Sequence, residues 1–345
     1  MSDSDQKRVL SGIQPSGLIH IGNYFGAIKN WIELLDDYEC FFAIVDLHVI
    51  TADYDPDELQ QRIMDAAIAN IACGLDPEKC TLFVQSHVPE HALLQWLLNS
   101  VASVGELQRQ HQYKQKKEQQ SHTEVSAGLM NYPILQAADI ALYHADLVPV
   151  GEDQRQHIEF TRDVLRRFNN RFGDYFTEPE ELINETGARI MGLDAENKMS
   201  KSLDNYIGVL EDPDTIRERI VSEGVTDPNR KRLDDPGNPE ICNIYSWHKL
   251  FSDEETIERV GKECRAAEIG CVDDKKLIAD NIIDYFEPMR ERARELREDT
   301  DQVRDILHEG AKKARTIAQD TLDQVMDLMG LKPDDLPPVE YFSSS

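Results

Sequence analysis

The chain lacks the features that mark membrane and secreted proteins. None of its apolar runs reaches the roughly 18 residues that a membrane-spanning helix needs, and it starts with a polar, acidic segment (Ser2, Asp3, Asp5) rather than a signal peptide. Its six cysteines are scattered, which is typical of reduced thiols and not of a disulfide framework. We therefore expect a cytoplasmic protein with no membrane partner.

Basic residues are also scarce. Lysine and arginine number 37 against 65 aspartate and glutamate residues, which gives a formal net charge of −28. Because RNA binding depends on cations that meet phosphates, any RNA-binding surface must be a local patch. The candidate basic clusters are Lys114/Lys116/Lys117, Arg166/Arg167/Arg171, Arg230/Lys231/Arg232 and Lys312/Lys313/Arg315. Each fits an ordinary solvated face better than a contact with RNA. The acidity of the chain fits either a salt-rich habitat or a need for solubility.

Apolar runs and amphipathic segments alternate over residues 1–211. The expected strands are 40–50, 80–88, 147–150 and 188–193, after a first one near residue 9, and the expected helices are 23–35, 56–73, 89–104, 131–143 and 152–168. This alternation predicts an α/β fold with a doubly wound, parallel, Rossmann-like sheet. Residues from about 105 to 145 are expected to form a helical insertion in it.

Beyond about residue 212 the strand patterns end and helical patterns take over. The expected helices are 214–222, 253–267, 274–297 and 301–329. We therefore expect residues 212–331 to form a C-terminal α-helical domain. Residues 332–345, with several prolines and serines, are expected to be a flexible tail.

The most informative motif is Lys198-Met199-Ser200-Lys201-Ser202, which follows the apolar run at 188–193. Two lysines around a small, bendable pair can contact the β- and γ-phosphates of ATP and neutralise charge as pyrophosphate leaves. Five fixed letters arise by chance in on the order of one chain in ten thousand of this size, so the motif favours this function over a solvated polar loop.

A second motif lies near the N-terminus, where Ser11-Gly12-Ile13-Gln14-Pro15-Ser16-Gly17 precedes His20-Ile21-Gly22-Asn23. A strand, a tight turn and a helix in this order present backbone N–H groups and a positive helix end to an anion. Gly22 leaves room for a flat adenine, and His20 and Asn23 offer neutral donors to phosphate or ribose oxygens. Taken alone, the segment is equally compatible with a simple turn before a helix.

Together the two motifs resemble the HIGH and KMSKS signatures of class I aminoacyl-tRNA synthetases, and in finer detail the bacterial-type tryptophanyl-tRNA synthetases. Val45-Asp46-Leu47-His48, Ala137-Ala138-Asp139-Ile140 and the segment from Val148 to Gln154 resemble the same family, in its order. The resemblance runs from about Arg8 to Leu331.

The resemblance implies a tryptophan–tRNA ligase. Such an enzyme activates L-tryptophan with ATP to tryptophanyl-adenylate and transfers it to the 3′ end of tRNA(Trp), as a homodimer. Residues 1–211 would be the catalytic domain and 212–331 the anticodon-binding domain. A tyrosyl-tRNA synthetase-like enzyme, which shares the fold and the lysine loop, remains an alternative. So does a catalytically silent paralogue that binds tryptophan or a nucleotide, although the intact lysines argue against it.

The resemblance also implies which residues would hold ATP and its Mg²⁺. Lys198, Lys201 and Lys116 would contact the phosphates, with Gln14 as a neutral catalytic donor. The implied ATP-binding set is Gln14, Pro15, Ser16, His20, Gly22, Asn23, Gly151, Glu152, Asp153, Ile190, Lys198, Met199, Ser200, Lys201 and Ser202. A solvated position for Lys116 and a helix N-terminal charge for Glu152 remain open.

Specificity for the amino acid is expected on one helical face. Tyr132, Gln136 and Asp139 share a face because they are spaced i, i+4 and i+7. An ionised aspartate complements an indole N–H, which donates and cannot accept. The implied tryptophan-binding set is Leu10, Val45, His48, Tyr132, Gln136, Asp139, Val148, Val150 and Gln154. A purely structural role for Asp139 and a core position for the valines remain open alternatives. Gln136 departs from the family, many of whose members carry Met at this position.

Three cysteines raise the question of a metal cluster. Cys242, Cys264 and Cys271, with Asp274 three residues on, resemble the four-cysteine iron–sulfur pattern of some tryptophanyl-tRNA synthetases. Because the fourth ligand would be a hard carboxylate where iron in a cluster prefers thiolate, we expect unmetallated thiols and no metal.

Protein purified without oxygen should therefore be colourless, and Cys271→Ser should retain full aminoacylation activity. Elemental analysis checks the first expectation and a charging assay the second. Brown protein with about four irons per chain would contradict both expectations and make Asp274 a ligand.

Overall fold

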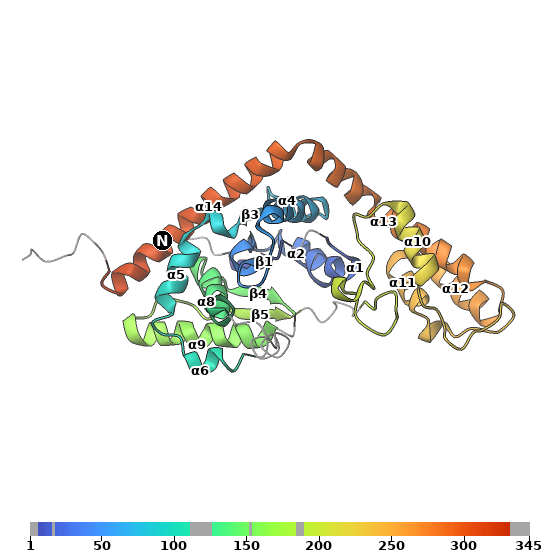
Figure 1. Ribbon diagram of the computed structural model, residues 1–345, viewed down its shortest axis with the longest axis horizontal. Helices are drawn as coiled ribbons and strands as arrows, with labels where there is room; N and C mark the ends of the chain where they lie inside the picture. The colour runs from blue at the N-terminus through green and yellow to red at the C-terminus, as the bar shows by residue number, and fades with distance from the viewer. Residues whose placement is uncertain (1–5, 16–17, 111–125, 152–153, 184–189, 332–345) are drawn as a thin grey trace, which may run out of the picture.

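The computed structural model describes residues 6–15, 18–110, 126–151, 154–183 and 190–331 (Figure 1). These residues form an α/β part built on one sheet and a helical part beside it (Figure 1). None of the described helices is both long and apolar enough to cross a membrane.

The sheet is entirely parallel, which confirms the predicted fold class. Its strands are β1 (Arg8–Ile13), β2 (Glu39–Ile44), β3 (Cys80–Val84), β4 (Leu147–Val150) and β5 (Glu180–Ile183), in the order β3-β2-β1-β4-β5. β1 pairs with β2 along its whole length, but with β4 only at Val9 and Leu147. The two strands therefore diverge at the point where the strand order reverses, which is where open α/β sheets bind ligands.

Three of the strand predictions need correction. The apolar run at 80–88 is a strand only as far as Val84, because the 3₁₀ turn η2 (Gln85–His87) follows. The apolar run at 40–50 is a strand only as far as Ile44, because Asp46 accepts hydrogen bonds from the backbone N–H groups of Leu47 and Ser86 and the chain turns into a short helix. The strand predicted at 188–193 is wrong in its described part, where Met191 makes only an isolated bridge to Lys198. The fifth strand is β5 instead, an edge strand whose acidic residues hide the apolar pattern.

The helices of the α/β part follow the predicted order. They are α1 (Ile21–Asn23), the π-helical turn η1 (Tyr24–Ile28), α2 (Lys29–Leu34), α3 (Asp46–Val49), α4 (Pro56–Ala72), α5 (Glu90–Leu98), α6 (Val104–Leu107), α8 (Ala127–Leu142) and α9 (Arg155–Phe172). The helix predicted at 89–104 ends at Leu98. The predicted insertion contains α6 and α8, and its middle lies outside the described residues.

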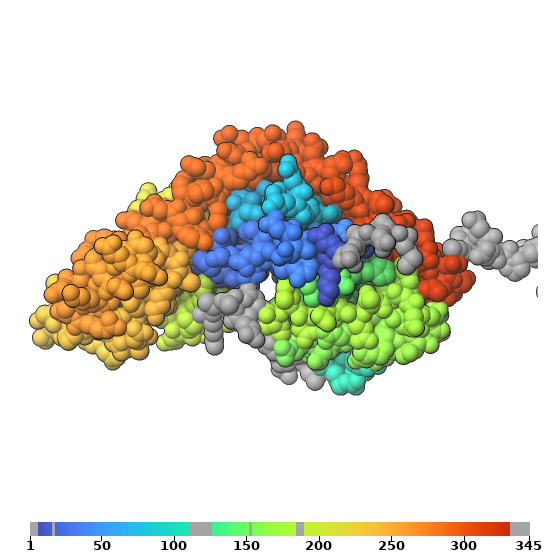
Figure 2. All heavy atoms as spheres, turned by 180° about the vertical axis from the view of Figure 1, so that it is seen from behind, coloured from blue at the N-terminus to red at the C-terminus, as the bar shows by residue number. Residues whose placement is uncertain are grey.

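The helical part contains α10 (Pro213–Glu223), α11 (Asn243–Phe251), α12 (Glu254–Arg265), α13 (Cys271–Glu298) and α14 (Thr300–Leu328). The sequence patterns missed α11. Helix α14 extends away from the other helices of the helical part and runs back over the α/β part, where it packs on β3 and α5 (Figures 1 and 2). Gly310 permits this approach, since a Cβ there would lie 1.9 Å from the carbonyl oxygen of Leu82.

Beside His20, the N-terminal turn contacts the segment that follows the lysine motif at 198–202. An isolated antiparallel bridge joins His20 to Gly208, and the N–H of Ile21 donates to the carbonyl of Ile207 at 3.0 Å. The His20 ring also caps α1, because its Nδ1 accepts the N–H of Asn23 at 3.1 Å. An accepting Nδ1 must be unprotonated. In agreement, burial and then the charge of Lys201 lower the pKa of His20 to about 4.

This lowered pKa makes stability depend on pH. Between about pH 6.5 and pH 4 the unfolded chain protonates His20 and the folded chain does not, so stability is lost as pH falls through this window. His20→Asn keeps a capping side chain that does not titrate. Urea unfolding at pH 7 and pH 5 should show about 1–2 kcal/mol less loss for this variant than for the unchanged protein. An equal loss in both would contradict the assignment, and substitution of the exposed His308 by Asn is the control.

Candidate active site

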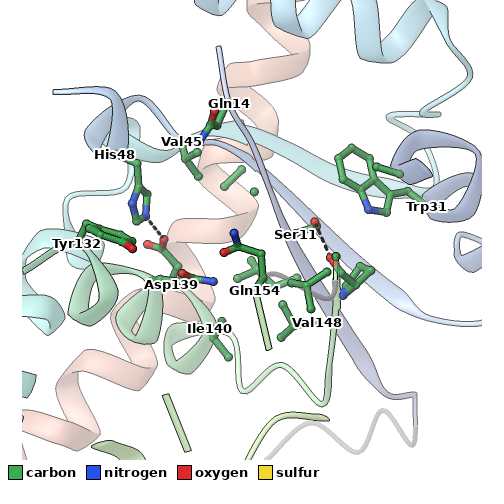
Figure 3. Close-up of a pocket in the computed structure, with 18 of the residues that line it drawn as sticks. Ser11, Gln14, Trp31, Val45, His48, Tyr132, Asp139, Ile140, Val148 and Gln154 are labelled. Carbon is green, nitrogen blue, oxygen red and sulfur yellow. Dashed lines mark hydrogen bonds and ion pairs between the residues drawn. The ribbon is translucent and has the colours of Figure 1, made fainter. Parts of the chain in front are cut away.

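A cavity of about 400 Å³ opens where β1 and β4 diverge (Figure 3). This volume is in the range of sites for small ligands. All the residues of the implied tryptophan-binding set line it: Leu10, Val45, His48, Tyr132, Gln136, Asp139, Val148, Val150 and Gln154. The structure therefore brings together side chains from β1, the end of β2, α3, α8, β4 and the start of α9.

The cavity has an apolar side that the sequence revealed only in part. Leu10, Val45 and Val148 are buried and contribute to it. Ala27 and Trp31 also line it from the helical run that follows the N-terminal motif, and Trp31 packs on Phe42 with ring centroids 5.3 Å apart. Their i, i+4 spacing places them on one face, which was the available signal.

Asp139 lies in the cavity wall, where Figure 3 shows its hydrogen bond with His48. It accepts further hydrogen bonds from other elements. His48 Nε2 lies 2.9 Å from Oδ2, while Gln85 Nε2 and His91 Nδ1 each lie 2.7 Å from Oδ1. Burial acts to raise the pKa of this carboxyl, but the hydrogen bonds from His48 and His91 outweigh it and hold the pKa well below its usual range. The group is an ionised acceptor, and its hydrogen bonds with described residues leave about one of its roughly four lone-pair sites for a ligand.

A buried layer behind Asp139 fixes its orientation. His91 and Tyr143 are fully buried, and Tyr143 Oη lies 2.8 Å from His91 Nε2. The two ring nitrogens of His91 therefore link the carboxylate to the tyrosine hydroxyl. Burial, followed by the charge of Asp139, raises the pKa of Tyr143. Sequence reasoning missed Gln85 and His91, since no local spacing relates them to Asp139.

A second hydrogen-bonded chain holds the polar end of the cavity. Tyr132 Oη lies 2.8 Å from His157 Nε2, and His157 Nδ1 lies 2.8 Å from the amide oxygen of Gln154. Burial raises the pKa of Tyr132, so its hydroxyl stays neutral. Figure 3 shows the Gln154 side chain reaching into the cavity toward Asp139. His157 is a further residue that the sequence did not reveal.

The residues of the implied ATP-binding set fall into separate places. Gln14 and Gly151 line the cavity. His20, Gly22 and Asn23 lie beside the lysine loop, the segment from Lys198 to Ser202, and a Cβ on Gly22 would lie 3.5 Å from Met199 Cβ. Pro15 is buried in the N-terminal turn. Ser16, Lys116, Glu152 and Asp153 lie outside the described residues.

Hydrogen bonds to buried residues hold the lysine loop in shape. The N–H of Met199 donates to the carbonyl of Ile190 at 3.1 Å, and both side chains are buried. Asn205, which the sequence did not single out, accepts the N–H of Ser200 at 2.7 Å and donates to the carbonyl of Lys198 at 3.2 Å. The Ser200 and Ser202 hydroxyls lie 2.9 Å apart. Burial lowers the pKa of Lys201.

The residues of the cysteine pattern lie at the starts of α11 and α13 and in α12. Cys242 and Cys264 are buried, while Cys271 at the start of α13 is partly exposed. Asp274, in the fourth position of the pattern, accepts a hydrogen bond from the buried His248 at 3.0 Å. Over the part of the chain that the structure describes, no group of three His, Cys, Asp or Glu side chains is placed to hold a metal ion.

Comparison with known proteins agrees with this geometry. The family model described as tRNA synthetases class I (W and Y) matches residues 2–287. The tryptophan–tRNA ligase of Deinococcus radiodurans is 50% identical over 327 residues, which cover 94% of this chain and 98% of that protein. Among solved structures, tryptophanyl-tRNA synthetase from Campylobacter jejuni complexed with ADP and tryptophan has a TM-score of 0.88 at 39% identity, covering 94% of this chain and all of that one.

A more distant structure shows how far the fold extends. Tyrosyl-tRNA synthetase from Archaeoglobus fulgidus complexed with L-tyrosine has a TM-score of 0.62 at 20% identity, covering 84% of this chain and 91% of that one, a likeness in fold alone. The matched family model spans most of the chain, and the D. radiodurans relative aligns along nearly its whole length. The chain belongs to the class I tRNA synthetases for tryptophan and tyrosine.

Proposed function

We propose that the chain is a tryptophan–tRNA ligase, which activates L-tryptophan with ATP and transfers it to the 3′ end of tRNA(Trp). The observation that carries this proposal is the ionised Asp139 in the wall of a partly apolar cavity at the β1–β4 crevice. The high similarity of the chain to tryptophan–tRNA ligases favours tryptophan over tyrosine as the substrate. The complete lysine loop favours an active enzyme over a silent paralogue.

The proposed substrate pose follows from the charges and hydrogen-bonding groups of the cavity. The indole ring would lie against Leu10, Val45 and Val148 and donate its N–H to Asp139. The ammonium group would lie near the hydroxyl of Tyr132. This hydroxyl would donate its proton to His157, and its oxygen lone pairs would accept a hydrogen bond from the ammonium. In this pose the substrate carboxylate faces the ATP end of the cavity, marked by Gln14 and Gly151.

The proposed chemistry needs no covalent enzyme intermediate. The substrate carboxylate attacks the α-phosphorus of ATP, which enters with Mg²⁺, and pyrophosphate leaves. Catalysis then consists mainly of positioning the reactants and stabilising charge on phosphate oxygens. Lys198 and Lys201 would supply that charge from the loop beside His20. Lys116, Glu152 and Asp153 keep the roles that the family resemblance implies for them.

We also propose a homodimer and a tRNA surface. Leu93, Trp96 and Val104 form exposed apolar positions on α5 and α6, and Trp96 is 71% exposed, which supports a contact with a second copy.

Lys231 and Arg232 are exposed and make no ion pair with a described residue, so they can meet RNA phosphates. Residues 212–331 would bind the anticodon.

Tryptophan should drive ATP–pyrophosphate exchange far better than tyrosine or phenylalanine. Asp139→Asn should reduce the preference for tryptophan over tyrosine by about tenfold or more, because the acceptor-only group is lost, and should leave ATP binding largely intact. Asp274→Asn is the matched control, because Asp274 is also buried against a histidine but lies in the helical part. Equal or better exchange with tyrosine in the unchanged protein would overturn the assignment.

Lys201→Ala should slow pyrophosphate exchange much more than it weakens tryptophan binding. The lysine charge is needed chiefly as pyrophosphate separates, and one such contact is worth about 2–4 kcal/mol in a transition state, roughly 30- to 1000-fold in rate. Substitution of the exposed Lys79, which pairs with Asp36, by alanine is the control. An unchanged exchange rate in Lys201→Ala would mean that the loop takes no part in the reaction.

A further inference from the structure

The polar side chains that line the cavity differ in how they are held. His48 is bound to Asp139, Tyr132 to His157, and the hydroxyl of Thr51 donates to the carbonyl of His48 at 2.8 Å. Gln136 lines the same cavity, is only partly exposed, and its amide makes no hydrogen bond with any described residue. A ligand that fills the cavity would therefore remove water from an amide that has no partner among the described residues.

The position of Gln136 on α8 indicates which part of a ligand it meets. It lies three residues before Asp139, a rise of about 4.5 Å, and four residues after Tyr132, a rise of about 6 Å, on the same helix face. In the proposed pose Asp139 accepts the N–H at ring position 1, and Tyr132 lies near the ammonium of the side chain at ring position 3. The ring atom between these two positions is carbon 2.

We propose that Gln136 is a specificity-determining residue that contacts the position-2 edge of the indole ring. It would make the cavity accept tryptophans with a hydrogen-bond acceptor at ring position 2. The inference rests on the proposed function of the cavity and deepens it, because it names a class of substrate. An acceptor at this position takes a hydrogen from the amide N–H₂ group of Gln136, whereas the C–H of tryptophan itself leaves that group unpaired.

A pair of nearly isosteric ligands tests this position. In 2-azatryptophan a ring nitrogen replaces carbon 2 and the N–H at position 1 is kept for Asp139. In 7-azatryptophan the added nitrogen also adjoins the N–H side of the ring but lies on the opposite edge, away from Gln136. Both change the ring by one atom, so size and apolar contact stay nearly equal.

The experiment measures kcat/KM for ATP–pyrophosphate exchange with tryptophan and both aza analogues. We expect the unchanged protein to use 2-azatryptophan at least tenfold better than 7-azatryptophan. Gln136→Met, which keeps the length of the side chain and removes its hydrogen bonds, should lower the ratio of 2-azatryptophan to tryptophan by about tenfold and leave the ratio of 7-azatryptophan to tryptophan within twofold. Ratios are the readout because Gln136 lines the cavity for every ligand.

Each outcome bears on one hypothesis. No preference for 2-azatryptophan in the unchanged protein, or the same loss for both analogues in Gln136→Met, would overturn the role of Gln136 while tryptophan-driven exchange still supports the ligase. If tryptophan drives no exchange, the proposed function fails. In that case, calorimetric titration of the unchanged protein with the three ligands tests the role of Gln136 separately. The same titration is used if the Gln136→Met variant does not fold.

Discussion

The site depends on one buried carboxylate that must stay ionised. A buried charge is stable only when hydrogen bonds replace its water, and Asp139 on α8 receives them from His48 of α3, Gln85 after β3 and His91 of α5. These contacts tie α8 to the carboxyl ends of β2 and β3. The cavity wall and the core of the α/β part are therefore stabilised by the same interactions.

The divergence of β1 from β4 supplies the space that this carboxylate faces. One paired position joins the two strands, and beyond it the side chains of both strands, of α8 and of the helical run from Ile21 to Leu34 surround a cavity. The helical run also contacts the helical part, since Tyr24 packs on Phe286 and Phe25 on Phe251 with ring centroids 5.3 and 5.5 Å apart. A movement of α11 or α13 would thus act directly on the wall of the site.

Local patterns in the sequence predicted much of this protein. Burial of a strand or a helix face leaves a period that neighbouring residues reveal, so β4, α4 and α9 lie close to their predicted positions. The spacing of Tyr132, Gln136 and Asp139 likewise placed them on one wall of one cavity. Patterns failed where burial is incomplete, as in β5, whose glutamates stand at an open edge.

The sequence by itself determined the fold class and the two motifs, because these depend on residues close along the chain. Only the tertiary structure showed that Gln85 and His91 hold Asp139 and that His157 links Tyr132 to Gln154. It alone placed α14 against β3 at Gly310. Gln85 and His91 precede Asp139 by 54 and 48 positions, and Gly310 lies still farther along the chain from β3. Contacts over such separations leave no periodic pattern in the sequence, so only the tertiary structure reveals them.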